Sequence, residues 1–138
     1  MDSTLTETEV RRLRSLGLTP IYGFVKQSQL HEELESLSSG LVKTMFNERG
    51  WGNGYVCLPA GHRWWGMEYD NIPVSVHGGL TFATFAEKLD WPEIDRNRVL
   101  PDDYVIGFDT RHYGDSLQRW PNAESVMAEV KRLIEQCE

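Results

Sequence analysis

The sequence changes character near residue 50, and this change restricts the fold more than any other feature of the chain. Before it, apolar residues recur at the spacing of an amphipathic helix: Leu30, Leu34, Leu37, Leu41 and Met45. Glycine and tryptophan then become frequent in the segment GWGNGYVCLPAGHRWWG at 50–66, and the helical spacing ends. Short apolar runs separated by glycine, proline and asparagine follow, which is typical of strands and turns. We therefore expect a sheet directly after residue 50.

The predicted elements combine into an α+β fold. Helices are expected over residues 6–18, 28–46 and 121–138, where Thr6 and Asn122 stand at capping positions. Short strands are expected at 20–25, 54–59, 73–78, 80–85 and 103–109. Helices flanking one small, mostly antiparallel sheet fit a single domain over 1–138, with a mainly helical part at 1–49 and a motif-bearing part at 50–138.

The composition restricts the classes of partner and location. The chain has 14 basic and 21 acidic residues and a formal net charge of −7, so we expect no binding to long nucleic acid. No run approaches the roughly 18 apolar residues that span a bilayer, and the polar start MDSTLTETEV lacks the pattern of a signal peptide. Cys57 and Cys137 form neither a disulfide framework nor a metal motif. These features predict a cytoplasmic protein with no membrane partner.

Polar residues with catalytic chemistry stand at the ends of two predicted strands. His77 ends the run VSVH and is followed by two glycines, which permit a tight turn or the close approach of a ligand. Asp109 ends the run YVIGFD, and His112 and Asp115 follow it at three-residue intervals. If both strands end at one sheet edge, the four side chains meet there. Two imidazoles and two carboxylates can bind a divalent transition metal or act as general acid and base.

Each residue of this set also has an ordinary structural explanation. Asp109 can form an Asx turn, Asp115 before Ser116 is typical of turns, and a single histidine is usually a hydrogen-bonded surface residue. Taken together, the set favours a site, because turn chemistry has no need of two histidines. We therefore take His77, Asp109, His112 and Asp115 as candidate catalytic residues and candidate metal ligands, and leave the cofactor open.

Aromatic and arginine side chains form a second set of candidates. They can stack on a planar ring such as a nucleobase and contact a phosphate, although aromatic residues are equally typical of a core. Trp64 and Trp65 are adjacent, so in an extended segment one of them points outward, where a ligand or an oligomer interface would cover it. The expected ligand-binding residues are Arg63, Trp64, Trp65, Gly78, Gly79, Thr81, Phe82 and Arg111.

Three segments carry a resemblance to a known family. They are NGYVCLPAGH at 53–62, GMEYDNIPVSVHGGLTF at 66–82 and YVIGFDTRHYGD at 104–115. Their order resembles a family of small, uncharacterised bacteriophage and prophage proteins with the motifs NGYV-LP-GH, VHGGLTF and GFDxxHxGD, over about residues 50–138. The resemblance implies a host-cytoplasm setting. By analogy with small phage proteins that sequester or cleave nucleotide immune signals, it also implies a role in countering host defence.

These observations lead to two hypotheses from different classes. In the first, a His/Asp/aromatic pocket recognises a nucleotide-like ligand, such as a cyclic nucleotide immune signal, and either sequesters it or hydrolyses it as a phosphodiesterase-type enzyme. In the alternative, exposed tryptophans bind a host protein and the chain performs no small-molecule chemistry. We also expect a homo-oligomer, since small phage proteins commonly form pockets between subunits.

Overall fold

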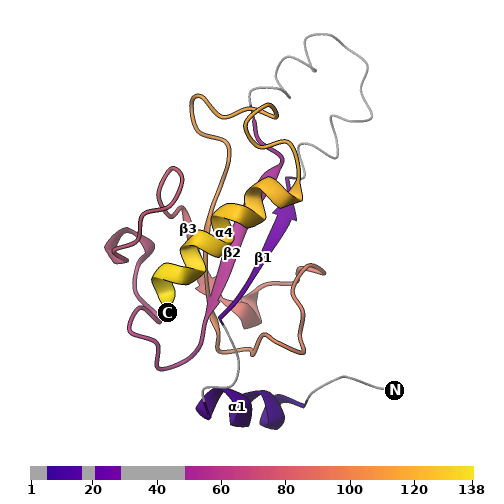
Figure 1. Ribbon diagram of the computed structural model, residues 1–138. Coiled ribbons are helices and arrows are strands. Elements are labelled where there is room, and N and C mark those ends of the chain that lie inside the picture. The colour runs from indigo at the N-terminus through magenta and orange to yellow at the C-terminus, as the bar shows by residue number, and fades with distance from the viewer. Residues whose placement is uncertain (1–5, 17–20, 29–48) are drawn as a thin grey trace.

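Antiparallel strands form one sheet in the computed structural model, which describes residues 6–16, 21–28 and 49–138. The strands are β1 (Tyr22–Gln27), β2 (Gly52–Leu58), β3 (Phe82–Phe85) and β4 (Tyr104–Phe108), in the order β1-β2-β4-β3 (Figure 1). Every residue of β4 is buried, and so is every residue of β2 except Asn53. Because neighbouring side chains of a strand point to opposite faces, both faces of these central strands are covered.

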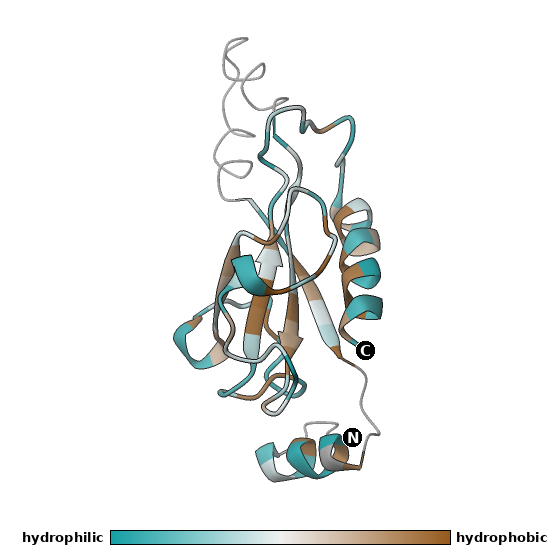
Figure 2. Cartoon of the chain, turned by 90° about the vertical axis from the view of Figure 1, so that its left-hand side faces the viewer, coloured by the Kyte–Doolittle hydropathy of each residue, from teal (hydrophilic) through white to brown (hydrophobic). Residues whose placement is uncertain are grey.

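Helix α4 (Ala123–Cys137) covers one face of the sheet and packs against β1 and β2 (Figure 1). It begins at Asn122, whose side-chain oxygen accepts the N–H of Ser125 at 2.9 Å, as the sequence predicts for a capped helix. Figure 2 shows its hydrophobic residues on the side next to the strands. Gly54 of β2 allows this close approach, since a Cβ there would lie 2.5 Å from Cγ2 of Val130.

Aromatic side chains fill the opposite face. Tyr55 alternates with Val56 along β2, so its ring points away from α4. The ring centroid of Tyr55 lies 5.2 Å from that of Phe24 and 4.9 Å from that of Trp91. The segment that contains η2 (Ala86–Lys88) and Trp91 completes this layer. Much of the aromatic content of the chain therefore belongs to the core.

Helix α1 (Glu7–Ser15) is fixed to the segment before β4 by an ion pair. The hydroxyl of Thr6 accepts the N–H of Glu9 at 3.1 Å and begins the helix, as predicted. Arg14 then donates through both terminal nitrogens to the fully buried carboxylate of Asp103, with Nη2 2.7 Å from Oδ2. Val10 is buried as well, so α1 combines apolar and ionic contacts.

The predicted strand at 73–78 is wrong, because helix α4 takes up the backbone groups of this segment. The N–H of Ser75 donates to Oε1 of Gln136 at 2.7 Å, and Nε2 of Gln136 donates to the Ser75 carbonyl at 2.8 Å. The N–H of His77 donates to Oε2 of Glu129 at 2.8 Å. Alternating apolar and polar residues here reflect a segment lying on a helix instead of a strand in a sheet.

The remaining strands are confirmed with shifts of a few residues at their ends. The sheet packed against α1 and α4 confirms the α+β class. The predicted helix at 28–46 falls almost wholly on residues 29–48, which lie outside the described residues. Among the helices that the structure describes, none has the length and apolar character needed to cross a bilayer.

Candidate functional site

The loop after β4 brings Asp109, His112 and Asp115 together through its own backbone. Asp109 directly follows the strand, and its Oδ1 accepts the N–H of Arg111 at 3.0 Å. A turn then forms, in which the N–H of Asp115 donates to the His112 carbonyl at 2.9 Å. In return, Oδ2 of Asp115 accepts the N–H of His112 at 2.8 Å. The turn chemistry expected from the sequence is present, and it positions the functional groups at the same time.

Thr110 attaches this loop to the start of β2. Its buried hydroxyl donates to the carbonyl of Gly52 at 2.7 Å, and its own carbonyl accepts the N–H of Gly50 at 2.7 Å. The residue before Gly50, Arg49, therefore lies beside the loop.

Asp115 is the centre of the polar group. Its side chain is only 1% exposed, and Oδ1 lies 2.7 Å from Nε2 of His77. Oδ1 also accepts the indole N–H of Trp120 at 3.2 Å, and the Trp120 ring centroid lies 4.7 Å from that of His77. Because an ionised carboxylate can only accept, Nε2 is the nitrogen of His77 that donates the proton in this contact. Asp115 thus fixes the orientation of His77.

His112 lies between two carboxylates. Its Nδ1 is 3.0 Å from Oδ1 of Asp109 and 3.8 Å from Oδ2 of Asp115. Neither contact is aligned as a hydrogen bond, so this buried nitrogen has no hydrogen-bond partner among the described residues. The ring packs directly on Gly78, where a Cβ would lie 2.5 Å from Cε1 of His112. Gly78 also has a φ of 69°, which favours glycine.

The structure therefore brings the four predicted catalytic residues into one group. One ligand atom each from His77, His112 and Asp115 lie within 4.8 Å of one another. Asp109 joins them through its 3.0 Å contact with His112. The group can hold a cation or exchange protons with a substrate. His77 reaches it from the segment held by α4 instead of from a sheet edge.

A hollow of about 800 Å³ opens beside this group. Its lining residues are Arg49, Asp109, Arg111, His112, Tyr113, Gly114, Asp115 and Ser116. In the described part of the chain, the guanidinium groups of Arg49 and Arg111 have no hydrogen bond or ion pair. Other arginines of the described ranges are paired with carboxylates, as Arg14 is with Asp103 and Arg132 is with Glu129. Two unpaired positive charges thus face one hollow of an acidic protein.

A second hollow, of about 390 Å³, lies on the His77 side of the group and is also lined by Arg119 and Glu129. Glu129 accepts two hydrogen bonds from Arg132, at 2.7 and 2.9 Å, besides the N–H of His77. The pKa of Glu129 is lowered, first by the hydrogen bonds from Arg132 and then by that from the His77 backbone. This ionised carboxylate holds the His77 segment on α4.

Arg63, Trp64 and Trp65 lie away from this group. Arg63 donates to the carbonyls of Gln136 and Cys137 at the end of α4, and its guanidinium lies 4.2 Å above the ring of Trp64. Trp64 is buried. Trp65 is 37% exposed, and its indole N–H donates to the carbonyl of Asp102 at 2.8 Å. These three residues of the expected ligand-binding set therefore make contacts within the fold, with the end of α4 and with the segment before β4.

Thr81 and Phe82 are closer to the group. They line a small hollow of about 140 Å³ together with Asp109 and Arg111. Phe82 packs edge-on against Tyr55, with ring centroids 5.4 Å apart. Gly79, like Gly78, has a positive φ, of 78°, but a Cβ there would meet nothing within 4 Å. Of the expected ligand-binding residues, Gly78 and Arg111 contact or adjoin the His/Asp group most directly.

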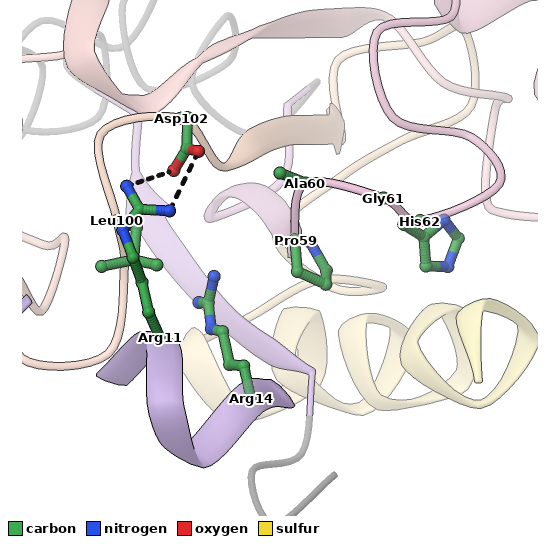
Figure 3. A pocket seen from close by; sticks show the side chains of 8 residues that line it. All are labelled: Arg11, Arg14, Pro59, Ala60, Gly61, His62, Leu100 and Asp102. Carbon is green, nitrogen blue, oxygen red and sulfur yellow. Dashed lines mark hydrogen bonds and ion pairs between the residues drawn. The ribbon is translucent and has the colours of Figure 1, made fainter. Parts of the chain in front are cut away.

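Another hollow, of about 480 Å³, lies between α1 and the segment after β2 (Figure 3). Arg11 and Arg14 line it, but Arg11 pairs with Asp102 and Arg14 with Asp103. His62, also in its wall, bonds the Cys137 carbonyl through Nε2 at 2.7 Å. Its arginine side chains already form ion pairs with carboxylates of the same chain, so it is a weaker anion site than the hollow beside His112.

Sequence reasoning missed three residues that shape the site. Arg49 reaches the hollow only through the hydrogen bonds of Thr110, and no local motif marks it. Trp120 donates a hydrogen bond to Asp115, and Glu129 accepts one from the His77 backbone. In the sequence, however, Trp120 stands just before a predicted helix and Glu129 within it, and neither position indicates a site.

Comparisons with protein-family models, with curated proteins and with solved structures find no match to this chain. The phage setting expected from the sequence motifs stays a prediction.

Proposed function

We propose that this chain binds a nucleotide-like phosphodiester in the hollow beside His112 and hydrolyses it. One observation carries the proposal: the unpaired guanidinium groups of Arg49 and Arg111 line the same hollow as the carboxylate and imidazole groups of Asp115 and His112. Guanidinium groups match phosphate oxygens in geometry and charge, and imidazole and carboxylate groups supply the chemistry of water activation.

The two sets of residues have separate tasks in this proposal. Hydrolysis adds a water oxygen to phosphorus and breaks a phosphorus–oxygen ester bond, so the water must lose a proton and the departing oxygen must gain one. The His/Asp group is placed to activate the water. Arg49 and Arg111 are placed to neutralise the negative charge on the phosphoryl oxygens. Phe82 and the exposed Tyr113 border the neighbouring surface and offer aromatic faces for a base.

The biological part of the proposal follows the sequence motifs. The ligand is a nucleotide immune signal of the host, and its removal counters host defence. The alternative of protein binding through exposed tryptophans has less support. Trp64 is buried, and Trp65 uses its indole N–H within the chain.

The test is incubation of the pure chain with a panel of cyclic and linear nucleotides, followed by analysis of the bound and the free material. Conversion to a hydrolysed product supports the proposal. Recovery of the intact nucleotide from denatured protein overturns hydrolysis and leaves sequestration. No retention and no conversion overturn both. Arg111→Ala and Arg49→Ala should each weaken binding about tenfold or more, whereas Arg98→Ala, which removes an exposed arginine paired with Asp95, should not.

A further inference from the structure

We propose that His77, His112 and Asp115 bind one divalent transition-metal ion of the zinc type. The ion would sit between Nε2 of His77, Nδ1 of His112 and the carboxylate of Asp115. The site itself stands on geometry, while its part in phosphodiester hydrolysis rests on the function proposed above.

The ligand atoms are near the spacing that such an ion needs. Ligand atoms about 2.1 Å from a tetrahedral zinc ion are about 3.4 Å from one another. Here Nε2 of His77 is 2.7 Å from Oδ1 of Asp115, and Nδ1 of His112 is 3.8 Å from Oδ2 of the same carboxylate. The first contact must widen and the second must shorten slightly. Small rotations of the imidazole rings achieve both changes, because the three ligand atoms all lie within 4.8 Å.

The unpartnered nitrogen of His112 points to the same conclusion. A buried polar atom without a hydrogen bond costs about 1–3 kcal/mol, so native structures rarely keep one. The Nδ1 of His112 is such an atom among the described residues, and its nearest polar neighbours are carboxylate oxygens. A metal ion placed between them accepts lone pairs from this nitrogen and from the carboxylate oxygens.

The charge balance favours a cation as well. Asp115 has a side chain 1% exposed, and Asp109 a side chain 19% exposed. Within the ranges that the structure describes, no lysine or arginine forms an ion pair with either carboxylate. A divalent ion supplies the charge that two poorly solvated carboxylates lack. Oδ1 of Asp109, 3.0 Å from Nδ1 of His112, is placed to become a fourth ligand.

The surroundings resemble those of a metal centre that keeps coordination positions open. The indole N–H of Trp120 donates to Oδ1 of Asp115, and the backbone N–H of His112 donates to Oδ2. Hydrogen bonds of this kind orient the ligands of metal sites. On the other side lies the hollow with Arg49 and Arg111. Three protein ligands with an open side are the pattern of catalytic zinc.

Metal binding requires the lone pair of Nε2 of His77, which now donates its N–H to Asp115 at 2.7 Å. A neutral imidazole provides that lone pair by carrying its proton on Nδ1 instead, so a metal–ligand bond replaces the hydrogen bond. Dependence on both imidazoles distinguishes this site from loose attraction of the ion to surface carboxylates.

The experiment is titration of the chelator-treated full chain with ZnCl2 and with MnCl2 by calorimetry, with bound metal counted by mass spectrometry. We expect one ion per chain and a loss of affinity of about 100-fold or more in both His77→Gln and His112→Gln. His62→Gln is the control, since this imidazole bonds the Cys137 carbonyl and lies outside the group.

A stoichiometry far below one ion, or unchanged affinity in both glutamine variants, overturns the metal site. No nucleotide is present in this titration, so its result is independent of the proposed function. Nucleotide binding without metal binding would contradict only the metal site. Metal binding without any nucleotide binding would contradict only the proposed function.

Discussion

Asp115 accepts a hydrogen bond from the imidazole of His77 at 2.7 Å, although the two residues lie 38 positions apart in the chain. This bond connects two segments that have no backbone pairing in common. One is the loop after β4, and the other is the segment that α4 holds through Glu129. The site therefore depends on helix, loop and sheet being correctly assembled, and its variants should affect stability as well as binding.

Asp115→Asn should destabilise the fold although the shape of the side chain is kept. The buried carboxylate accepts hydrogen bonds from His77 and Trp120 at Oδ1 and from the His112 backbone at Oδ2. In asparagine one of these oxygens becomes an amide nitrogen, which cannot accept the bonds made to that position. We expect the free energy of unfolding to fall by about 1.5–3 kcal/mol, measured by urea denaturation. Asp102→Asn is the matched control, because that carboxylate is 40% exposed and should cost well under 1 kcal/mol. Equal losses in the two variants would contradict the central role of Asp115.

Gly78→Ala and Gly79→Ala form a matched pair. Both residues have positive φ, so each alanine should cost about 1–2 kcal/mol of backbone strain. Only the Gly78 variant also places a Cβ against His112, 2.5 Å from Cε1, whereas at Gly79 nothing lies within 4 Å. We expect Gly78→Ala alone to displace the His112 ring and weaken zinc binding by tenfold or more. Similar zinc affinities in the two variants would show that Gly78 does not position His112.

Acid should loosen the contact between the His77 segment and α4. The pKa of Glu129 is lowered from its ordinary value of 4.5, first by hydrogen bonds from Arg132 and also by the N–H of His77. A lowered carboxyl pKa contributes stability that is fully present above about 4.5 and is lost as the pH falls through the folded-state value. Wild type and Glu129→Gln should therefore differ in free energy of unfolding at pH 7, and the difference should shrink as the pH falls below 4.5. A difference in free energy that stays constant over this range would show that ionised Glu129 does not hold the His77 segment on α4.

The two cysteines should be unreactive in the folded chain. Burial raises the pKa of Cys137 to about 11 and that of Cys57 further, so at pH 8 both remain thiols. Alkylation by iodoacetamide, followed by mass spectrometry, should proceed far more slowly than in the urea-unfolded chain. Stability from Cys137 is fully present below its ordinary pKa of 9 and declines as the pH rises toward 11. Rapid labelling of either cysteine in the native chain would show that its burial is wrong.

Local signals in the sequence predict the fold well where one element decides the outcome. The cap at Asn122 and the apolar spacing of α4 specify that helix, and the alternation in β4 specifies a buried strand. The segment at 73–78 shows the limit of such signals. Its alternation suits a strand, but side chains of a distant helix take up its backbone groups.

The same contrast between local signals and long-range contacts applies to the site. Asp109, His112 and Asp115 are close in sequence, so turn chemistry alone predicts that they meet. The participation of Arg49 depends on the bonds between Thr110 and the start of β2, which no local pattern reveals. Arg63 looked equally suited to a phosphate, yet it binds carbonyls at the end of α4. The composition identifies arginines, but only the packing shows which of them are free to meet a ligand.

The central claim is that the His/Asp group and the arginine-lined hollow act together on a phosphodiester. The most direct measurement is zinc-supplemented turnover of bis(4-nitrophenyl) phosphate and of the nucleotide panel by wild type, His112→Gln and Arg111→Ala, with His62→Gln as control. The account predicts turnover in wild type and control, at least about 100-fold slower hydrolysis in His112→Gln, and weaker substrate binding in Arg111→Ala. Turnover that is absent in wild type, or undiminished in His112→Gln, would contradict the account.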